Sequence, residues 1–125
     1  MILYLSKVFA IKLKTIMNKL GQWDNRNSGE LFGAILELEN VAEARRFFRD
    51  LLTEQEIIEF SNRWRAARML SENKSYKDII MQTGLSSRTV ARISKWLENG
   101  TNGYKLIIKR MNNHHNPSSL EKGLS

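Results

Sequence analysis

The 125-residue chain contains no cysteine, one proline and seven glycines. The lack of cysteine excludes disulfides and thiolate metal sites, and it fits a reducing compartment such as the cytoplasm. Few prolines and glycines favour helices joined by short loops, and no alternating strand pattern is long enough to indicate a sheet. The apolar stretch over residues 1–20 is too short and too charged to span a membrane. We therefore expect one all-α domain and no membrane partner.

The residue patterns of catalysis and metal binding are also missing. The chain has no phosphate-binding glycine-rich loop, no zinc-type spacing and no nucleophile–base pair. His114 and His115 are adjacent in the sequence, so they would point apart on a helix, and no third ligand is near. We interpret them as part of a polar tail. The sequence therefore predicts no catalytic residues, no metal, no cofactor and no enzymatic activity.

Positive charge is present in excess and is unevenly spread. The net charge is +7. Residues 26–59 contain 4 basic and 8 acidic side chains, a net −4, whereas residues 63–110 contain 11 basic and 3 acidic ones, a net +8. A basic second half is expected if that part of the chain meets phosphates.

Residues 75–98 have the pattern of a helix-turn-helix. Ser75 is predicted to cap a short first helix, Gly84 to end it, and Ser86 to cap a second helix. Such a pair places its second helix in the DNA major groove. An ordinary helical hairpin with a basic outer face is the alternative. The apolar residues expected to point inward and fix the crossing of the two helices are Ile79, Leu85, Val90 and Ile93.

The outer side of the second helix carries basic and small polar side chains. Arg88 and Arg92 lie one turn apart on one face, and an arginine can donate two hydrogen bonds to a guanine edge. Short hydroxyl side chains let the helix N-terminus approach bases and phosphates. Lys77 and Lys95 are better placed for phosphates. The predicted DNA-binding residues are Lys77, Ser86, Ser87, Arg88, Thr89, Arg92 and Lys95.

Three regions are predicted along the chain: an N-terminal arm over residues 1–20, a helical domain over residues 28–112 and a flexible tail over residues 113–125. Leu5, Phe9 and Leu13 have helical spacing in the arm. The arm could be an upstream extension with Met17 as the true start, a partner-binding helix or, as the last choice, a membrane-surface helix.

Four more helices are predicted in the domain from apolar periodicity and caps. The first begins with Ser28 as its cap and extends to Leu38. The second covers residues 41–51, and a capping box of Thr53 and Glu56 starts a third that ends near residue 72. After the helix-turn-helix, Gly100 is expected to supply a left-handed cap. The last helix covers residues 104–111.

The aromatic content is large for helices this short. One small domain would struggle to bury all of these side chains, so a second copy is expected to cover part of them and to form a homodimer. A dimer would also present two reading helices to two half-sites about one DNA turn apart. The aromatic residues concerned are Phe32, Phe47, Phe48, Phe60, Trp64 and Trp96.

Three segments closely resemble the Trp-repressor-like family, and within it the YerC/YecD-type subgroup. The similarity covers about residues 30–111. It implies an all-helical, intertwined homodimer with a helix-turn-helix that binds operator DNA and represses transcription. Besides the helix-turn-helix, the segments are Leu52-Thr53-Glu54-Gln55-Glu56, Arg63-Trp64-Arg65-Ala66-Ala67-Arg68-Met69-Leu70 and Asn99-Gly100-Thr101-Asn102-Gly103-Tyr104.

The resemblance also implies an effector pocket, although the match there is incomplete. Ile93 stands where tryptophan-binding members have glycine, and Trp96 stands where they have serine. One residue is also missing near Asn73. The bulky side chains of Ile93 and Trp96 would fill the slot that takes the indole ring of tryptophan. We therefore expect another effector or none. The residues that match pocket positions are Leu52, Thr53, Arg63, Thr89 and Arg92.

The sequence thus predicts a cytoplasmic, sequence-specific DNA-binding transcriptional regulator that acts as a repressor. Its expected partners are double-stranded DNA, a second copy and an unidentified small-molecule effector. The alternative is a helix-turn-helix module for protein interaction or DNA architecture without effector control. Arg63, Arg65 and Arg68 could instead pair with the acidic first half of a second copy, which is the simpler interpretation of Arg65 and Arg68.

Overall fold

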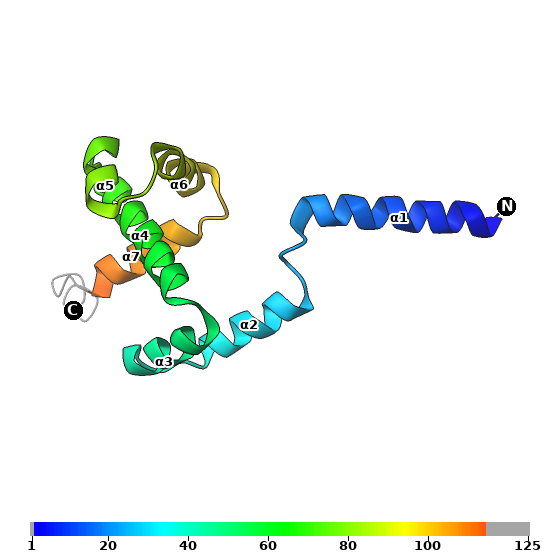
Figure 1. Cartoon of the computed structure of the whole chain (residues 1–125), viewed down its shortest axis with the longest axis horizontal. Coiled ribbons are helices and arrows are strands. Elements are labelled where there is room, and N and C mark those ends of the chain that lie inside the picture. Colours follow the sequence, from blue (N-terminus) through cyan, green and yellow to red (C-terminus); the bar gives the residue numbers. More distant parts are fainter. Residues whose placement is uncertain (1, 115–125) are drawn as a thin grey trace, which may run out of the picture. The chain divides into compact units, whose positions relative to one another are not determined.

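The computed structural model describes residues 2–114, all of whose regular secondary structure is helical (Figure 1). None of these helices is long and apolar enough to cross a membrane. The chain divides into two compact units, Met1–Asp50 and Leu51–Ser125. The helices are α1 (Ile2–Gly21), α2 (Arg26–Leu36), α3 (Val41–Leu51), α4 (Glu54–Ser71), α5 (Tyr76–Thr83), α6 (Ser87–Asn99) and α7 (Gly103–His114).

Helix α2 begins earlier than the sequence predicts. Asn25 is its N-cap and accepts a hydrogen bond from the Ser28 amide at 3.0 Å. Ser28 completes a capping box, because its hydroxyl accepts a hydrogen bond from the Asn25 amide. The prediction that Ser28 caps the helix is therefore wrong. The helix also ends at Leu36, which leaves Leu38 outside it.

Helices α2 and α3 have no buried residue in the described chain. Asn40 holds the start of α3, where its side chain accepts a hydrogen bond from the Glu43 amide at 2.9 Å. The Glu43 carboxylate in turn accepts one from the Glu39 amide. These helix ends are satisfied locally, but the apolar sides of both helices are at most half-buried, as at Leu31, Ile35, Phe47 and Phe48.

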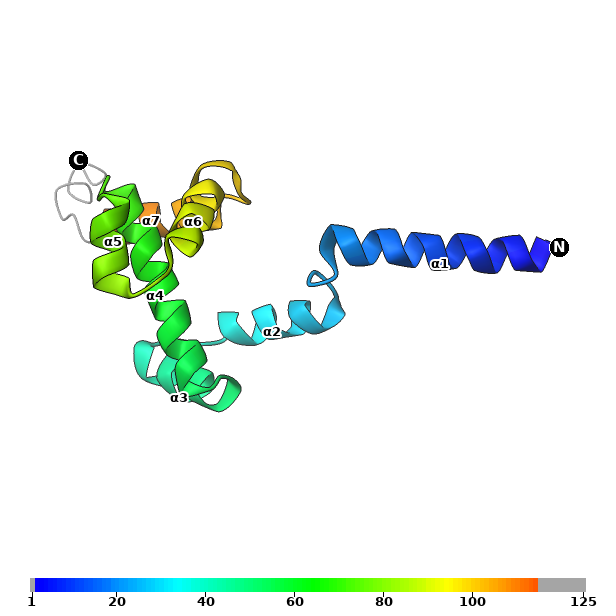
Figure 2. The ribbon, with the colours of Figure 1, turned by 45° about the horizontal axis from the view of Figure 1, so that its top comes forward.

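The second unit is built on α4, which packs against α5 and α6 (Figure 2). The predicted Thr53–Glu56 capping box starts α4, with the Glu56 amide donating to the Thr53 hydroxyl at 3.1 Å. Helix α7 is anchored to α4 by Trp64 and Tyr104, whose rings stack with centroids 6.2 Å apart.

Two predictions near the C-terminal side need correction. Gly100 ends α6 with φ −85° and ψ −154°, which is extended rather than left-handed. Glycine is needed there for space, since a Cβ would collide with the carbonyl oxygen of Trp96. Helix α7 also continues to His114, into the stretch predicted as tail. His115 and the rest of that stretch lie outside the described residues.

Candidate nucleic-acid interface

The turn between α5 and α6 is formed as the sequence predicts. Ser75 caps α5, where its hydroxyl accepts a hydrogen bond from the Asp78 amide at 3.2 Å. Gly84 ends α5 in the left-handed conformation, with φ 72°, and its amide donates to the Ile80 carbonyl at 2.9 Å. Glycine adopts this conformation at little cost, so the chain can reverse within three residues of α5.

Thr83 joins the end of α5 to the turn. Its side chain is buried, and its hydroxyl donates to the Ile79 carbonyl at 2.6 Å. The same hydroxyl accepts a hydrogen bond from the Leu85 amide at 3.3 Å. One buried hydroxyl thus satisfies a carbonyl of the helix and an amide of the loop, which fixes the direction in which the chain leaves α5.

Ser86 caps α6 and satisfies a free amide at its N-terminus. Its hydroxyl accepts a hydrogen bond from the Thr89 amide at 3.1 Å and lies 3.0 Å from the Thr89 hydroxyl. Both serines at the start of the helix, Ser86 and Ser87, are exposed. The first turn of α6 therefore presents small polar side chains and the positive end of the helix dipole to solvent.

The inner side of the helix-turn-helix is a fully buried apolar contact. Ile79, Val90 and Ile93 are 0% exposed, and Leu85 packs against them. Ala66 and Ala67 on α4 are also fully buried. Alanines allow the helices to approach closely, so α4 holds both α5 and α6 against one core. These contacts set the crossing angle and leave the other side of α6 in solvent.

That outer side carries three cationic side chains about one helical turn apart. We call this set the reading face: Arg88, Arg92 and Lys95. Their spacing puts them on one face of α6, and all three are exposed. Among residues 2–114, no carboxylate forms an ion pair with any of them. Lys77 on α5 is likewise exposed and unpaired within that range. Their charges are therefore available to an anionic partner.

Arg65 links α4 to the end of α5, a contact that the sequence did not reveal. Its guanidinium donates to the Gln82 side chain at 2.8 Å and to the Gln82 carbonyl at 3.3 Å. The interpretation that Arg65 pairs with acidic residues of a second copy stays a prediction, and within one chain its partner is Gln82. The two residues are 17 positions apart, so neither periodicity nor a short motif could indicate the contact.

Comparisons with known proteins agree with this geometry. A sequence model described as the Trp repressor protein matches residues 26–112. The chain belongs to the Trp repressor family. The uncharacterised protein YerC of Bacillus subtilis (strain 168) is 37% identical over 90 residues, which are 72% of this chain and 86% of YerC. The resemblance to the YerC-type subgroup is thereby confirmed.

Two crystal structures of other proteins share the fold of this Trp repressor family chain. A TrpR-like protein from Eubacterium eligens ATCC 27750 has a TM-score of 0.69 and 36% identity, over 73% of this chain and 94% of the other. A proposed Trp repressor from Staphylococcus aureus has a TM-score of 0.68 and 38% identity, over 77% of this chain and 93% of the other. These matches confirm the predicted all-helical, Trp-repressor-like fold.

The positions that match the family's effector pocket are spread over several elements. Thr53 caps α4, whereas Arg63 lies ten residues further along the same helix, an axial rise of about 15 Å. Thr89 and Arg92 lie on α6, which packs against α4. The residues that match pocket positions therefore lie at the start of α4, in the middle of α4 and on α6.

Arg63 is held mainly by its own helix. Its guanidinium is 2.7 Å from the Glu59 carboxylate and 5.8 Å from the centroid of the Phe60 ring. Its Nε is buried without a hydrogen-bond partner among the described residues. Ile93, at the position where the resemblance to tryptophan-binding members implies a glycine, is fully buried in the core, while Trp96 is 46% exposed. Ile93 thus occupies space that a glycine would leave open.

The described residues form no cluster suited to a metal ion. Between residues 2 and 114, no group of three or more His, Cys, Asp or Glu could hold a metal ion. The Trp repressor family is one of DNA-binding regulators and not of enzymes.

Proposed function

We propose that this protein is a sequence-specific DNA-binding transcriptional repressor in the cytoplasm. The observation that carries the proposal is the reading face, three exposed cations on α6 that form no ion pair within residues 2–114. The opposite side of α6 is held by fully buried apolar residues. A rigid helix with basic and small polar residues on its outer side fits the major groove. Membership of a family of DNA-binding regulators supports the same conclusion.

Within the groove, the side chains divide into base-reading and backbone-binding groups. Arg88 and Arg92 point from the same side of α6 and can each donate two hydrogen bonds to a guanine. Lys77 and Lys95 serve phosphates, and the exposed hydroxyls of Ser86 and Ser87 allow close approach of the helix N-terminus. Thr89, half-buried and bonded to Ser86, stiffens the first turn.

A homodimer is the form in which this chain would bind DNA. Helices α2 and α3 bury no residue, and Phe32, Leu36 and Val41 are 47%, 84% and 69% exposed. Helix α7 also leaves Leu106 and Ile107 exposed. Eleven-residue helices are marginal alone in water, so their stability has to come from packing of the apolar faces. A second copy supplies that packing and the second reading helix.

Tryptophan is not the expected effector. The buried Ile93 fills the position at which tryptophan-binding relatives have glycine, and the capping of α4 engages the Thr53 hydroxyl. A different small molecule, or none, would then control DNA binding. The second candidate function is an architectural or protein-binding helix-turn-helix. Against it, the positions where a protein-docking surface would carry apolar anchors hold Ser87, Arg88 and Arg92.

The proposal is tested with Arg88→Ala. If Arg88 reads a guanine, affinity for a selected operator falls by about 1–3 kcal/mol and preference at one base pair is blurred, while affinity for random DNA changes little. Fluorescence anisotropy at several salt concentrations measures both quantities. Lys77→Ala is the matched control, which should weaken all sequences alike and reduce the salt dependence by about one charge. Equal loss for Arg88→Ala on operator and random DNA would contradict base reading.

A further inference from the structure

Helix α1 carries positive charge without negative charge. It extends without a break from Ile2 to Gly21 and contains four lysines, and the first acidic residue of the chain is Asp24. A solvated helix usually mixes both signs, so that oppositely charged side chains one turn apart stabilise each other. Such pairs are impossible within α1. Its charge therefore suits a partner with a high density of negative charge.

The same helix carries an exposed apolar stripe. Leu5, Phe9 and Leu13 follow one another at intervals of four residues, so they share one face. They are 62%, 69% and 47% exposed. Lys7 and Lys14 are seven residues apart and lie together on the opposite side of the helix. The stripe gains free energy by leaving water, which phosphates alone cannot provide.

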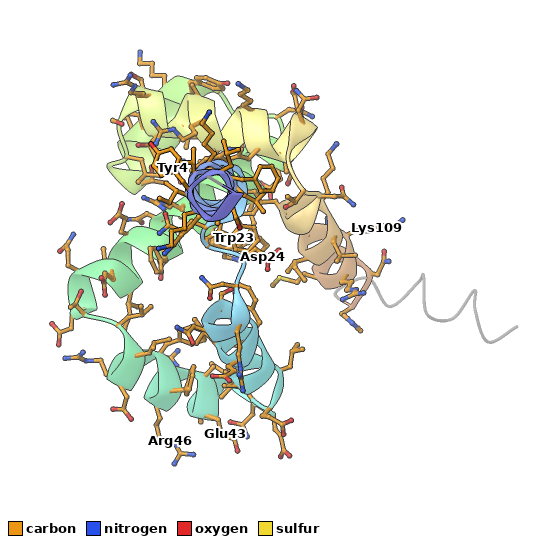
Figure 3. All side chains as sticks on the ribbon, turned by 90° about the vertical axis from the view of Figure 1, so that its right-hand side faces the viewer. Tyr4, Trp23, Asp24, Glu43, Arg46 and Lys109 are labelled. Atoms are coloured by element: carbon orange, nitrogen blue, oxygen red, sulfur yellow. The ribbon has the colours of Figure 1, made fainter. Side chains whose placement is uncertain are left out.

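Tyr4 marks the side of α1 away from the stripe. Tyr4, labelled on α1 in Figure 3, is 71% exposed. It lies three residues before Lys7, and this spacing puts the two side chains on the same side of the helix. Its exposure matches that of Phe9, but it would face water when the Phe9 side is covered. The two aromatic residues thus provide a matched pair for testing which side of α1 is bound.

We propose that α1 binds flat on the surface of an anionic phospholipid membrane. Leu5, Phe9 and Leu13 insert at the boundary between headgroups and acyl chains, and Lys12, which follows Phe9 by three residues and is exposed, lies beside the lipid phosphates. Lys7 and Lys14 point toward water and add longer-range attraction to the anionic surface. DNA would neutralise the lysines but leave the apolar stripe in water, whereas a lipid surface satisfies both. The helix lies on the membrane and does not cross it. This proposal revises the sequence-based expectation of no membrane partner.

The test uses the full chain and sedimentation with lipid vesicles. The wild-type protein is expected to sediment with vesicles of phosphatidylglycerol and phosphatidylcholine, and much less with pure phosphatidylcholine. Phe9→Ser should lower the partition coefficient between water and anionic vesicles at least about tenfold, because it removes the aromatic ring that the membrane would bury. Tyr4→Ser changes helix propensity equally but should leave binding nearly unchanged. Lys7→Gln with Lys14→Gln should reduce the preference for anionic vesicles.

DNA affinity is measured on the same variants. Phe9→Ser and Tyr4→Ser should bind operator DNA as the wild type does, and Arg88→Ala should bind vesicles as the wild type does. The proposal is overturned if anionic vesicles are not preferred, or if Phe9→Ser and Tyr4→Ser behave alike. It is also overturned if Phe9→Ser weakens DNA binding, which would make α1 a DNA-binding arm. Failure here leaves the repressor proposal intact, because the two use different residues.

Discussion

Gly84 has φ 72° at the end of α5, a backbone conformation that costs a residue with a Cβ about 1–2 kcal/mol. The space around it is open, since a Cβ there would meet no atom within 4 Å. The requirement for glycine is therefore a matter of backbone conformation and not of packing. The conformation matters because it determines where the chain enters α6.

We predict that Gly84→Ala lowers the free energy of unfolding by about 1 kcal/mol or slightly more. Gly84→Asn should cost less, because asparagine tolerates the left-handed region better than alanine. Urea denaturation at one fixed protein concentration compares the three proteins. Equal stability of Gly84→Ala and the wild type would show that the turn relaxes to another conformation.

Capping residues were predictable from local sequence at α4, α5 and α6. Ser75, Ser86 and Thr53 were each identified as caps and confirmed. Before α2 the choice was ambiguous, because Asn25 and Ser28 can both cap and stand three positions apart. Both take part, with Asn25 as the cap and Ser28 as its reciprocal partner. Sequence pattern does not show which of two such residues begins the helix.

At the scale of elements, α6 depends on its first turn for its position. Ser86 satisfies the Thr89 amide, whereas Ser87 is exposed and forms no side-chain hydrogen bond to another described residue. We predict that Ser86→Ala lowers the free energy of unfolding by about 1 kcal/mol, as loss of an N-cap does. Ser87→Ala, the matched control, should change it by less than about 0.5 kcal/mol.

Thermal or urea unfolding of the two variants distinguishes these outcomes. An equal effect of both substitutions would mean that the Ser86 hydrogen bond contributes no stability in solution. Because both serines are predicted DNA-binding residues, DNA affinity is recorded separately from stability.

The bounds of the helices could largely be read from apolar spacing. Helix α3 has the predicted ends, and α4 to α6 differ from prediction by a residue or so. Helix α7 extends beyond its last apolar residue, Met111, because polar residues can continue a helix without adding to the periodic pattern. The Arg65–Gln82 contact was not predictable, since it depends on how α4 and α5 are placed in space.

At the scale of the whole molecule, the exposed apolar surface supports the proposal that a second copy covers it. Helices α2 and α3 are amphipathic without burying any residue in one chain. The large aromatic content of the sequence indicated that apolar surface would be left exposed. Apolar spacing alone cannot say whether the same chain or a second copy buries that surface. Apolar spacing is equally silent on the effector positions, which lie just before α4, on α4 and on α6. Two copies would pair two reading helices for two half-sites.

The most direct test of DNA reading is selection of bound duplexes from a random pool, with and without free amino acids. The account predicts enrichment of an imperfect palindrome whose half-sites lie about one helical turn apart. The enriched sequence should be the same with and without tryptophan, and Arg88→Ala should lose its preference at one position of each half-site. Retention of DNA without any enriched sequence would contradict the central claim, because the α6 cations would then bind only phosphates.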